Sequence, residues 1–113
     1  MAEEIKTVKA FTLHNDGAFV ARIRVHWINP MDGSSGDYES SGYHDICAAA
    51  ERTLNLSEAG FAEGTLVRLH AVVVLGKDQD ADRYYVYSAN GGIADYTISG
   101  TTLINSLKFN GLN

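Results

Sequence analysis

The segment from Phe19 to Trp27 alternates between apolar and polar side chains, and this pattern constrains the fold more than any other feature of the chain. Its odd-numbered residues are apolar, whereas Arg22, Arg24 and His26 between them are polar. A period of two places these sets on opposite faces of an extended strand. One face therefore lies against a core and the other against water, as is typical of an antiparallel sheet.

Further strand-like segments follow along the chain, separated by turns rich in Gly, Asn and Asp. Asn15-Asp16-Gly17 is such a turn, and it predicts a tight hairpin that leads into the 19–27 strand. Strands are expected over residues 5–14, 19–27, 52–56, 65–76, 84–88, 95–99 and 102–110, with a shorter one near Tyr38. About seven or eight short strands predict an all-β fold, an antiparallel β-sandwich that forms a single domain over residues 1–113.

The same alternation predicts the core. The first strand departs from it, because Val8 and Ala10 fall out of phase with Phe11 and Leu13, which predicts a bulge or an edge position. The expected core residues are Phe19, Ile23, Val25, Trp27, Leu69, Val73, Val86, Leu103 and Phe109.

Composition and charge exclude some functions. The 113 residues carry a formal net charge of -5, which argues against a nucleic-acid partner, because binding phosphates requires a basic face. Cys47 is the single cysteine, so no intramolecular disulfide is expected. The first residues lack a basic stretch followed by an apolar one, so we expect a soluble cytoplasmic protein, or one released without a signal peptide.

Asp78, Asp80 and Asp82 form an Asp-x-Asp-x-Asp run with the ligand spacing that opens a calcium loop. The remaining ligands of such a loop are missing, because Arg83 and Ala89 stand where a glycine and a bidentate glutamate belong. The alternative is a solvated charged turn. No cofactor is expected, apart from a calcium ion at this run if the first interpretation holds.

Other combinations of side chains could carry chemistry. His14, His26, His44 and His70 could assemble a metal site, or they could be polar-face residues without a ligand. Cys47 is expected to be a small buried residue rather than a nucleophile.

Five tyrosines are candidate ligand-binding residues. A tyrosine offers an apolar body and a polar tip to a sugar or to a lipid head group. An aromatic platform at one end of the sandwich is one interpretation, and cross-strand packing is the other. The candidate residues are Tyr38, Tyr43, Tyr85, Tyr87 and Tyr96.

Both ends of the chain resemble known families. The stretch from Phe11 to Gly17, followed by Ile23 to Trp27, resembles the opening hairpin of the aegerolysins. The stretch from Tyr96 to Thr102, continuing to Gly111, resembles their closing pair of strands around a Ser-Gly turn. The same layout is similar to the small β-sandwich proteins that are up-regulated in long-lived nematode insulin-receptor mutants.

The resemblance implies an acidic β-sandwich without enzymatic activity. In aegerolysins such a domain binds sphingolipid-containing membranes, and some members act with a larger pore-forming partner. The nematode family implies a dimeric sandwich. This chain departs from the aegerolysin pattern because Trp27 is its single tryptophan, so no further tryptophan can be matched to a lipid-binding surface.

These observations lead to one expected function and one alternative. The expected function is a non-enzymatic binding module that recognises a membrane lipid or glycan head group through tyrosines and polar loops, alone or as half of a toxin pair. The alternative is a β-sandwich interaction protein that forms a homodimer or heterodimer and binds no small ligand. An enzyme is not expected, because no nucleophile, base and oxyanion motif can be assembled from the sequence.

Overall fold

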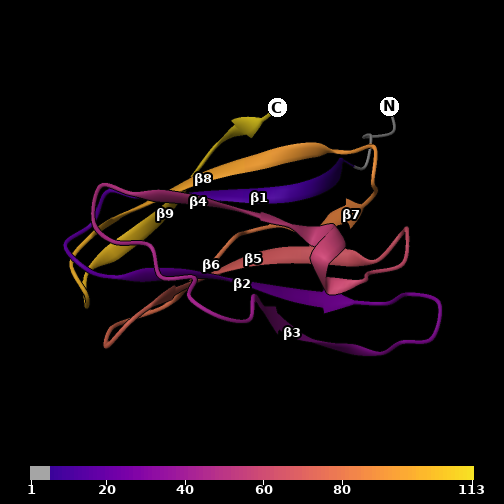
Figure 1. Cartoon of the computed structure of the whole chain (residues 1–113), viewed down its shortest axis with the longest axis horizontal. Helices are drawn as coiled ribbons and strands as arrows, with labels where there is room; N and C mark the ends of the chain where they lie inside the picture. The colour runs from indigo at the N-terminus through magenta and orange to yellow at the C-terminus, as the bar shows by residue number, and fades with distance from the viewer. Residues whose placement is uncertain (1–5) are drawn as a thin grey trace.

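The computed structural model of the chain describes residues 6–113 and confirms an all-β fold (Figure 1). The described residues form nine strands and one short 3-10 helix. The elements are β1 (Thr7–Asn15), β2 (Ala21–Ile28), β3 (Ser35–Glu39), β4 (Glu51–Asn55), η1 (Leu56–Ala59), β5 (Leu66–Val73), β6 (Gln79–Asp80), β7 (Tyr85–Tyr87), β8 (Gly92–Gly100) and β9 (Asn105–Leu112).

The strands hydrogen-bond in the order β3-β2-β5-β7-β1-β8-β9, with β4 paired to β1 and β6 paired to β5. Strand β1 runs parallel to β7 and to β8, whereas the other pairs are antiparallel. The sheet is therefore mixed, and the expectation of a purely antiparallel fold was wrong. The parallel pairing is possible because β1 and β8 are far apart in the sequence. No hairpin joins them, and a hairpin would have made them antiparallel neighbours.

Two groups of strands share one core. One group contains β1, β4, β8 and β9, and the other contains β2, β3, β5 and β6 (Figure 1). The short strand β7 pairs with β5 and with β1, so it joins the groups into one continuous sheet. Buried side chains from both groups belong to a single hydrophobic cluster. The fold is thus a sandwich whose two layers remain hydrogen-bonded to each other.

The alternation predicted for the 19–27 segment is confirmed in β2. Ile23 and Val25 are buried, while Arg22 and Arg24 lie on the wet face, where they pair with acidic neighbours. Among the other expected core residues, Phe19, Leu69 and Val73 are buried as well, and Trp27 packs against the cluster from its margin.

Three expected core residues are misplaced. Val86 faces away from the core because its neighbours Tyr85 and Tyr87 point inward, so the phase of β7 is the reverse of the expected one. Leu103 is 72% exposed and Phe109 is 40% exposed. Leu103 lies in the turn before β9 rather than in a strand, so strand alternation does not apply to it.

The first strand contains the irregularity that its sequence predicts. The pairing of β1 with β8 shifts register between Val8 and Ala10, as a bulge does. Residue 5, the first of the expected strand, lies outside the described residues. None of the helices in residues 6–113 has the length and apolar character needed to cross a membrane.

The Asn15-Asp16-Gly17 turn does not form the expected hairpin, because β1 and β2 do not pair with each other. The chain instead crosses from one layer to the other at this point. Asn15 is fully buried, and its side-chain nitrogen donates to the carbonyl oxygens of Phe19 at 2.7 Å and Ile46 at 2.9 Å. Gly17 lies against the ring of Phe19, and this ring would have to shift to make room for a Cβ.

Replacing Asn15 should weaken the fold considerably. Asn15→Ala leaves two buried carbonyl oxygens and the Gly17 amide without their side-chain partner. Because each unsatisfied buried group costs about 1–3 kcal/mol, we expect the free energy of unfolding to fall by at least about 2 kcal/mol in urea titrations. Asn55→Ala is the matched control, since Asn55 is exposed at the end of β4 and should change stability by less than about 0.5 kcal/mol. Equal losses in both variants would contradict this role of Asn15.

Candidate functional site

The structure does not bring the five candidate tyrosines together. Tyr85, Tyr87 and Tyr96 are buried in the core, with 1%, 6% and 2% of their surface exposed. The hydroxyl groups of Tyr85 and Tyr96 hydrogen-bond to each other at 2.9 Å, and burial raises the pKa of both phenols. These three rings pack across the core and offer no surface to a ligand, as the packing alternative predicts.

The other two candidate tyrosines reach the surface. Tyr38 is half-buried on β3 and donates its hydroxyl to Glu58 at 2.8 Å. Tyr43 is 73% exposed in the loop between β3 and β4, and the guanidinium of Arg52 lies 5.4 Å from the centre of its ring. These side chains therefore remain candidates for contact with a ligand.

The aspartates of the 78–82 run bind a histidine or face solvent. Asp78 contacts Nε2 of His70 at 3.0 Å, and Asp80 contacts Nδ1 at 2.6 Å. The side chain of Asp82 is 86% exposed. In residues 6–113 no group of three or more His, Cys, Asp and Glu side chains has the arrangement that holds a metal ion. The run thus acts in the described structure as a clamp on His70.

The remaining histidines are also separated from one another. His14 lies between Glu51 and Asp95, and His26 contacts Asp37. Cys47, expected to be buried, is exposed. His14, His26 and His70 therefore contact carboxylates on polar faces, whereas His44 contacts the carbonyl oxygen of Gly42.

An exposed apolar feature at one end of the molecule was missed by sequence reasoning. Leu75 is 95% exposed, Ile104 is 81% exposed and Leu103 is 72% exposed. Leu75 lies in the β5–β6 loop and the other two lie in the β8–β9 turn, and Figure 1 places both connections at the left end of the molecule. We call these three residues the apolar tip.

Hydrogen bonds join the two connections that carry the apolar tip. The amide of Lys77 donates to the carbonyl oxygen of Thr102 at 2.7 Å, and the side chain of Asn105 donates to the carbonyl oxygen of Lys77 at 3.0 Å. Gly76 allows this approach, because a Cβ there would collide with the Thr102 carbonyl. The apolar tip is consequently a fixed part of the fold rather than two independent loops.

The backbone of Leu75 adds a second unusual feature. Its φ angle is 61°, in the left-handed region that non-glycine residues rarely adopt. An ordinary L-residue pays about 1–2 kcal/mol for this conformation. Leu75 therefore combines a strained backbone with an apolar side chain that is almost wholly in water, and neither feature stabilises the fold.

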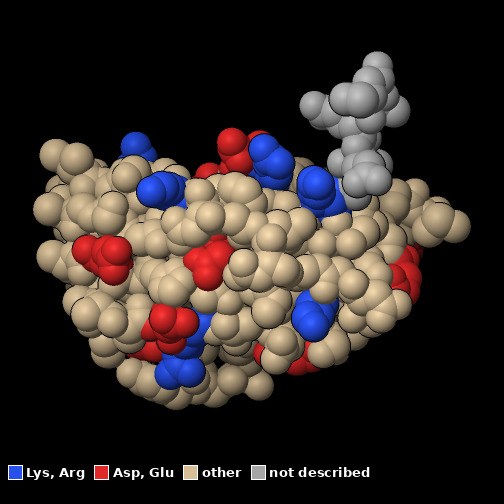
Figure 2. Space-filling view, turned by 90° about the horizontal axis from the view of Figure 1, so that it is seen from above, with Lys and Arg blue, Asp and Glu red and all other residues tan. Residues whose placement is uncertain are grey.

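The β5–β6 loop of this end carries two charged residues, Lys77 and Asp78, beside Leu75. Figure 2 shows the molecule from above with the same end on the left, and there the outermost atoms of the visible face belong to neither acidic nor basic residues. Asp78, clamped to His70, also accepts a hydrogen bond from the amide of Val73 at 2.8 Å. This carboxylate closes the base of the loop that presents Leu75.

A signal for the apolar tip was present in the sequence but was read as core. Leu103 and Ile104 are adjacent, so a single strand could not bury both on one face. They also follow Gly100 and two threonines, a composition typical of a turn. Their proximity to Leu75 depends on tertiary structure and has no local signal.

No family model and no curated protein matches this chain. Solved structures match it at low identity. Listeriolysin O matches with 14% identity and a TM-score of 0.53 over 92% of this chain and 22% of its own. Pneumolysin matches with 16% identity and a TM-score of 0.49, and the human-specific toxin intermedilysin with 23% identity and a TM-score of 0.49. Each of the latter two matches covers 92% of this chain and 23% of the matched protein.

The match to listeriolysin O concerns the fold of one segment. This chain spans less than a quarter of the length of each matched protein. The solved structures that match are neither aegerolysins nor nematode proteins, so the resemblance drawn from the sequence stays a prediction. The chain shares its β-fold with a segment of listeriolysin O.

Proposed function

We propose that this chain is a non-enzymatic module that binds the surface of a lipid membrane through its apolar tip. The observation that carries the proposal is the exposure of Leu75, Leu103 and Ile104 on two connections that hydrogen bonds hold together. The fold shared with a segment of listeriolysin O is consistent with a domain that works beside other parts of a toxin. A separate chain that supplies those parts would be the second half of the expected toxin pair.

The size of the apolar tip sets the expected strength of binding. Full transfer of one Leu or Ile side chain out of water is worth about 1.5–3 kcal/mol. Once the cost of association is subtracted, three such side chains give a membrane affinity similar to that of a single acyl anchor. Such an anchor binds membranes weakly and reversibly. Lys77, exposed beside Leu75, would add about 1 kcal/mol on an anionic surface. Stable attachment would then require a partner or several copies of the module.

The alternative use of the apolar tip is assembly with another protein chain, either a second copy or a different partner. It buries the same side chains without a membrane, so it predicts a mass that rises with concentration. The two functions separate in one set of measurements, because lipid vesicles are required for the first and irrelevant to the second.

Substitutions in the apolar tip should weaken membrane binding without unfolding the protein. We expect Leu75→Asn, Leu103→Asn and Ile104→Asn each to lower vesicle partitioning by about tenfold, since each removes about 1.4 kcal/mol or more of apolar burial. Leu75→Asn should keep or raise the melting temperature, because asparagine tolerates the left-handed backbone better than leucine. Co-sedimentation with vesicles that contain sphingolipid, with and without sterol, measures the partitioning.

Met31→Asn is the matched control for these variants. Met31 is 90% exposed, but it lies in the β2–β3 connection, which Figure 1 places at the opposite end of the molecule. It should leave partitioning unchanged. If all four variants bind like the parent protein, or if no vesicle composition pellets the parent, the membrane proposal fails. A concentration-dependent mass that disappears in the tip variants would then favour assembly.

The His70 clamp should make the apolar tip sensitive to pH. Burial lowers the pKa of His70, but the hydrogen bonds and charges of Asp78 and Asp80 outweigh it and hold the pKa above the usual 6.5. A raised folded-state pKa means that the clamp contributes its full stability below about pH 6.5 and loses it as the pH rises through the folded pKa. We therefore expect the 74–78 loop to open more readily, and vesicle partitioning to weaken, as the pH is raised from about 6 to about 9.

Hydrogen exchange of the Leu75 to Lys77 amides, corrected for the intrinsic pH dependence of exchange, measures this opening. His70→Gln should remove the pH dependence of both loop opening and partitioning. His14→Gln is the control, because hydrogen bonding to Asp95 raises the pKa of His14 in the same way while His14 makes no contact with the loop among the described hydrogen bonds and ion pairs. A pH dependence that survives in His70→Gln would contradict the role assigned to the clamp.

A further inference from the structure

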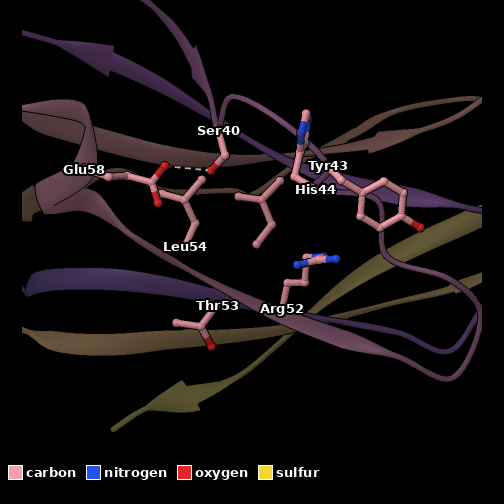
Figure 3. Close-up of a pocket in the computed structure, with 8 residues that line it drawn as sticks. Ser40, Tyr43, His44, Arg52, Thr53, Leu54 and Glu58 are labelled. Carbon is pink, nitrogen blue, oxygen red and sulfur yellow. Dashed lines mark hydrogen bonds between the residues drawn. The ribbon is translucent and has the colours of Figure 1, made fainter.

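A small cavity lies on the flank of the molecule, between the loop before β4 and the strand itself (Figure 3). Its volume is about 170 Å³. It is lined by Ser40, Tyr43, His44, Arg52 and Glu58, with Leu54 on its apolar side. The residues of the apolar tip take no part in it, so it is a separate candidate site.

His44 borders the cavity but offers no free contact to a ligand. Its Nδ1 donates to the carbonyl oxygen of Gly42 at 2.7 Å, because a carbonyl can only accept. Its Nε2 is buried with almost no accessible surface, so a ligand in the cavity does not reach it.

Glu58 and Arg52 supply opposite charges to the same cavity. One oxygen of Glu58, Oε2, already accepts from Tyr38 and Ser40, each at 2.8 Å, which leaves Oε1 for a ligand. Nε of Arg52 donates to the carbonyl oxygen of Asp45 at 2.9 Å, so the donors open to a ligand are those of the two terminal nitrogens. In Figure 3 the carboxylate and the guanidinium lie on different sides of the cavity. The lining therefore has no net charge, which disfavours a simple anion or a simple cation.

Tyr43 adds an exposed aromatic surface. Its ring is 73% exposed and is held from one side by the guanidinium of Arg52, 5.4 Å from the ring centre. A stacked cation restricts the rotation of the ring at little cost. A pre-positioned ring binds an apolar ligand face with less loss of entropy than a free one.

Size and hydrogen-bonding pattern together select the ligand class. Pockets that enclose a drug-sized molecule measure about 300–1000 Å³, so 170 Å³ accommodates one small ring. A zwitterionic phosphocholine head group would match the two charges, but its phosphate would be drawn to Arg52 and so toward the adjacent Tyr43 ring, whose negative face disfavours an anion. A sugar ring has hydroxyl groups that both donate and accept, and a C–H face that suits Tyr43.

We propose that this cavity is a binding site for a single neutral sugar residue. Hydroxyl groups of the sugar donate to Glu58 and accept from Arg52, while its C–H face lies on Tyr43. Such a site recognises one ring of a glycan, whether the glycan is free, on a protein or on a lipid. It does not depend on the apolar tip, so either site can bind without the other.

Titration of the full chain with soluble monosaccharides tests this inference without any membrane. The probes are glucose, galactose, mannose, fucose and N-acetylglucosamine, with phosphocholine as the competing ligand class, followed by amide shifts in two-dimensional NMR. We expect at least one sugar to shift the amide signals of residues 40–44 and 52–58 saturably, while phosphocholine does not. Tyr43→Ala and Glu58→Gln should each weaken sugar binding by about tenfold.

Tyr84→Ala is the matched control, since the guanidinium of Arg68 lies 4.8 Å from the centre of the Tyr84 ring in an equivalent pair that does not line this cavity. It should leave sugar affinity unchanged. The inference is overturned if none of the sugars shifts these signals, if phosphocholine shifts them in preference, or if Tyr43→Ala binds as tightly as Tyr84→Ala. Because no vesicle is present, these results do not depend on the apolar tip.

Discussion

The arrangement of both layers depends on the buried side chain of Asn15. At this residue the chain leaves β1 and enters the opposite layer, so backbone groups that a hairpin would have paired face the interior instead. The amide of Asn15 satisfies the Phe19 and Ile46 carbonyls and the Gly17 N–H. Without Asn15 the Phe19 carbonyl and the Gly17 N–H would be buried unpaired, which is costly, while the Ile46 carbonyl would keep only the backbone amide of Ala21 as a donor. The crossover frees one edge of β1 for β8 and the other for β4 and β7.

Sequence patterns predicted the strands better than they predicted the phase of β7. The β2 alternation is clear because charged arginines occupy one face of the strand. The side chains between them must then face the core. In β7 the choice lay between tyrosines and a valine, and burying the valine was the obvious choice. The structure buries the tyrosines because the Tyr85 and Tyr96 hydroxyls satisfy each other across the core. Although few residues separate β7 from β8 in the chain, these strands lie on either side of β1 and do not pair with each other, so no local pattern predicts the contact.

For the candidate sites too, the sequence identified some of the residues but not the contacts that depend on tertiary structure. Tyr38 and Tyr43 were identified from residue type, since tyrosine in a polar loop is a reasonable ligand contact. The cavity beside them also needs Glu58 from η1 and Arg52 from β4, and their convergence follows from the pairing of β4 with β1. The apolar tip needs the β5–β6 and β8–β9 connections to meet. Each connection looks like an ordinary turn by itself. The sequence therefore does not predict that the two connections lie side by side.

The strongest argument that the apolar tip serves binding is that both the side chain and the backbone of Leu75 are unfavourable for the stability of the fold. Burial cannot explain its side chain, which is 95% exposed, and backbone preference cannot explain a leucine at a φ angle of 61°. Glycine or asparagine would remove both costs at no loss of packing. The surrounding structure nonetheless enforces the conformation, through the Asp78 carboxylate at the base of the loop and the Thr102 carbonyl across it. Local choices that oppose the stability of the fold concentrate at functional sites, and Leu75 is such a choice, held in place by these hydrogen bonds.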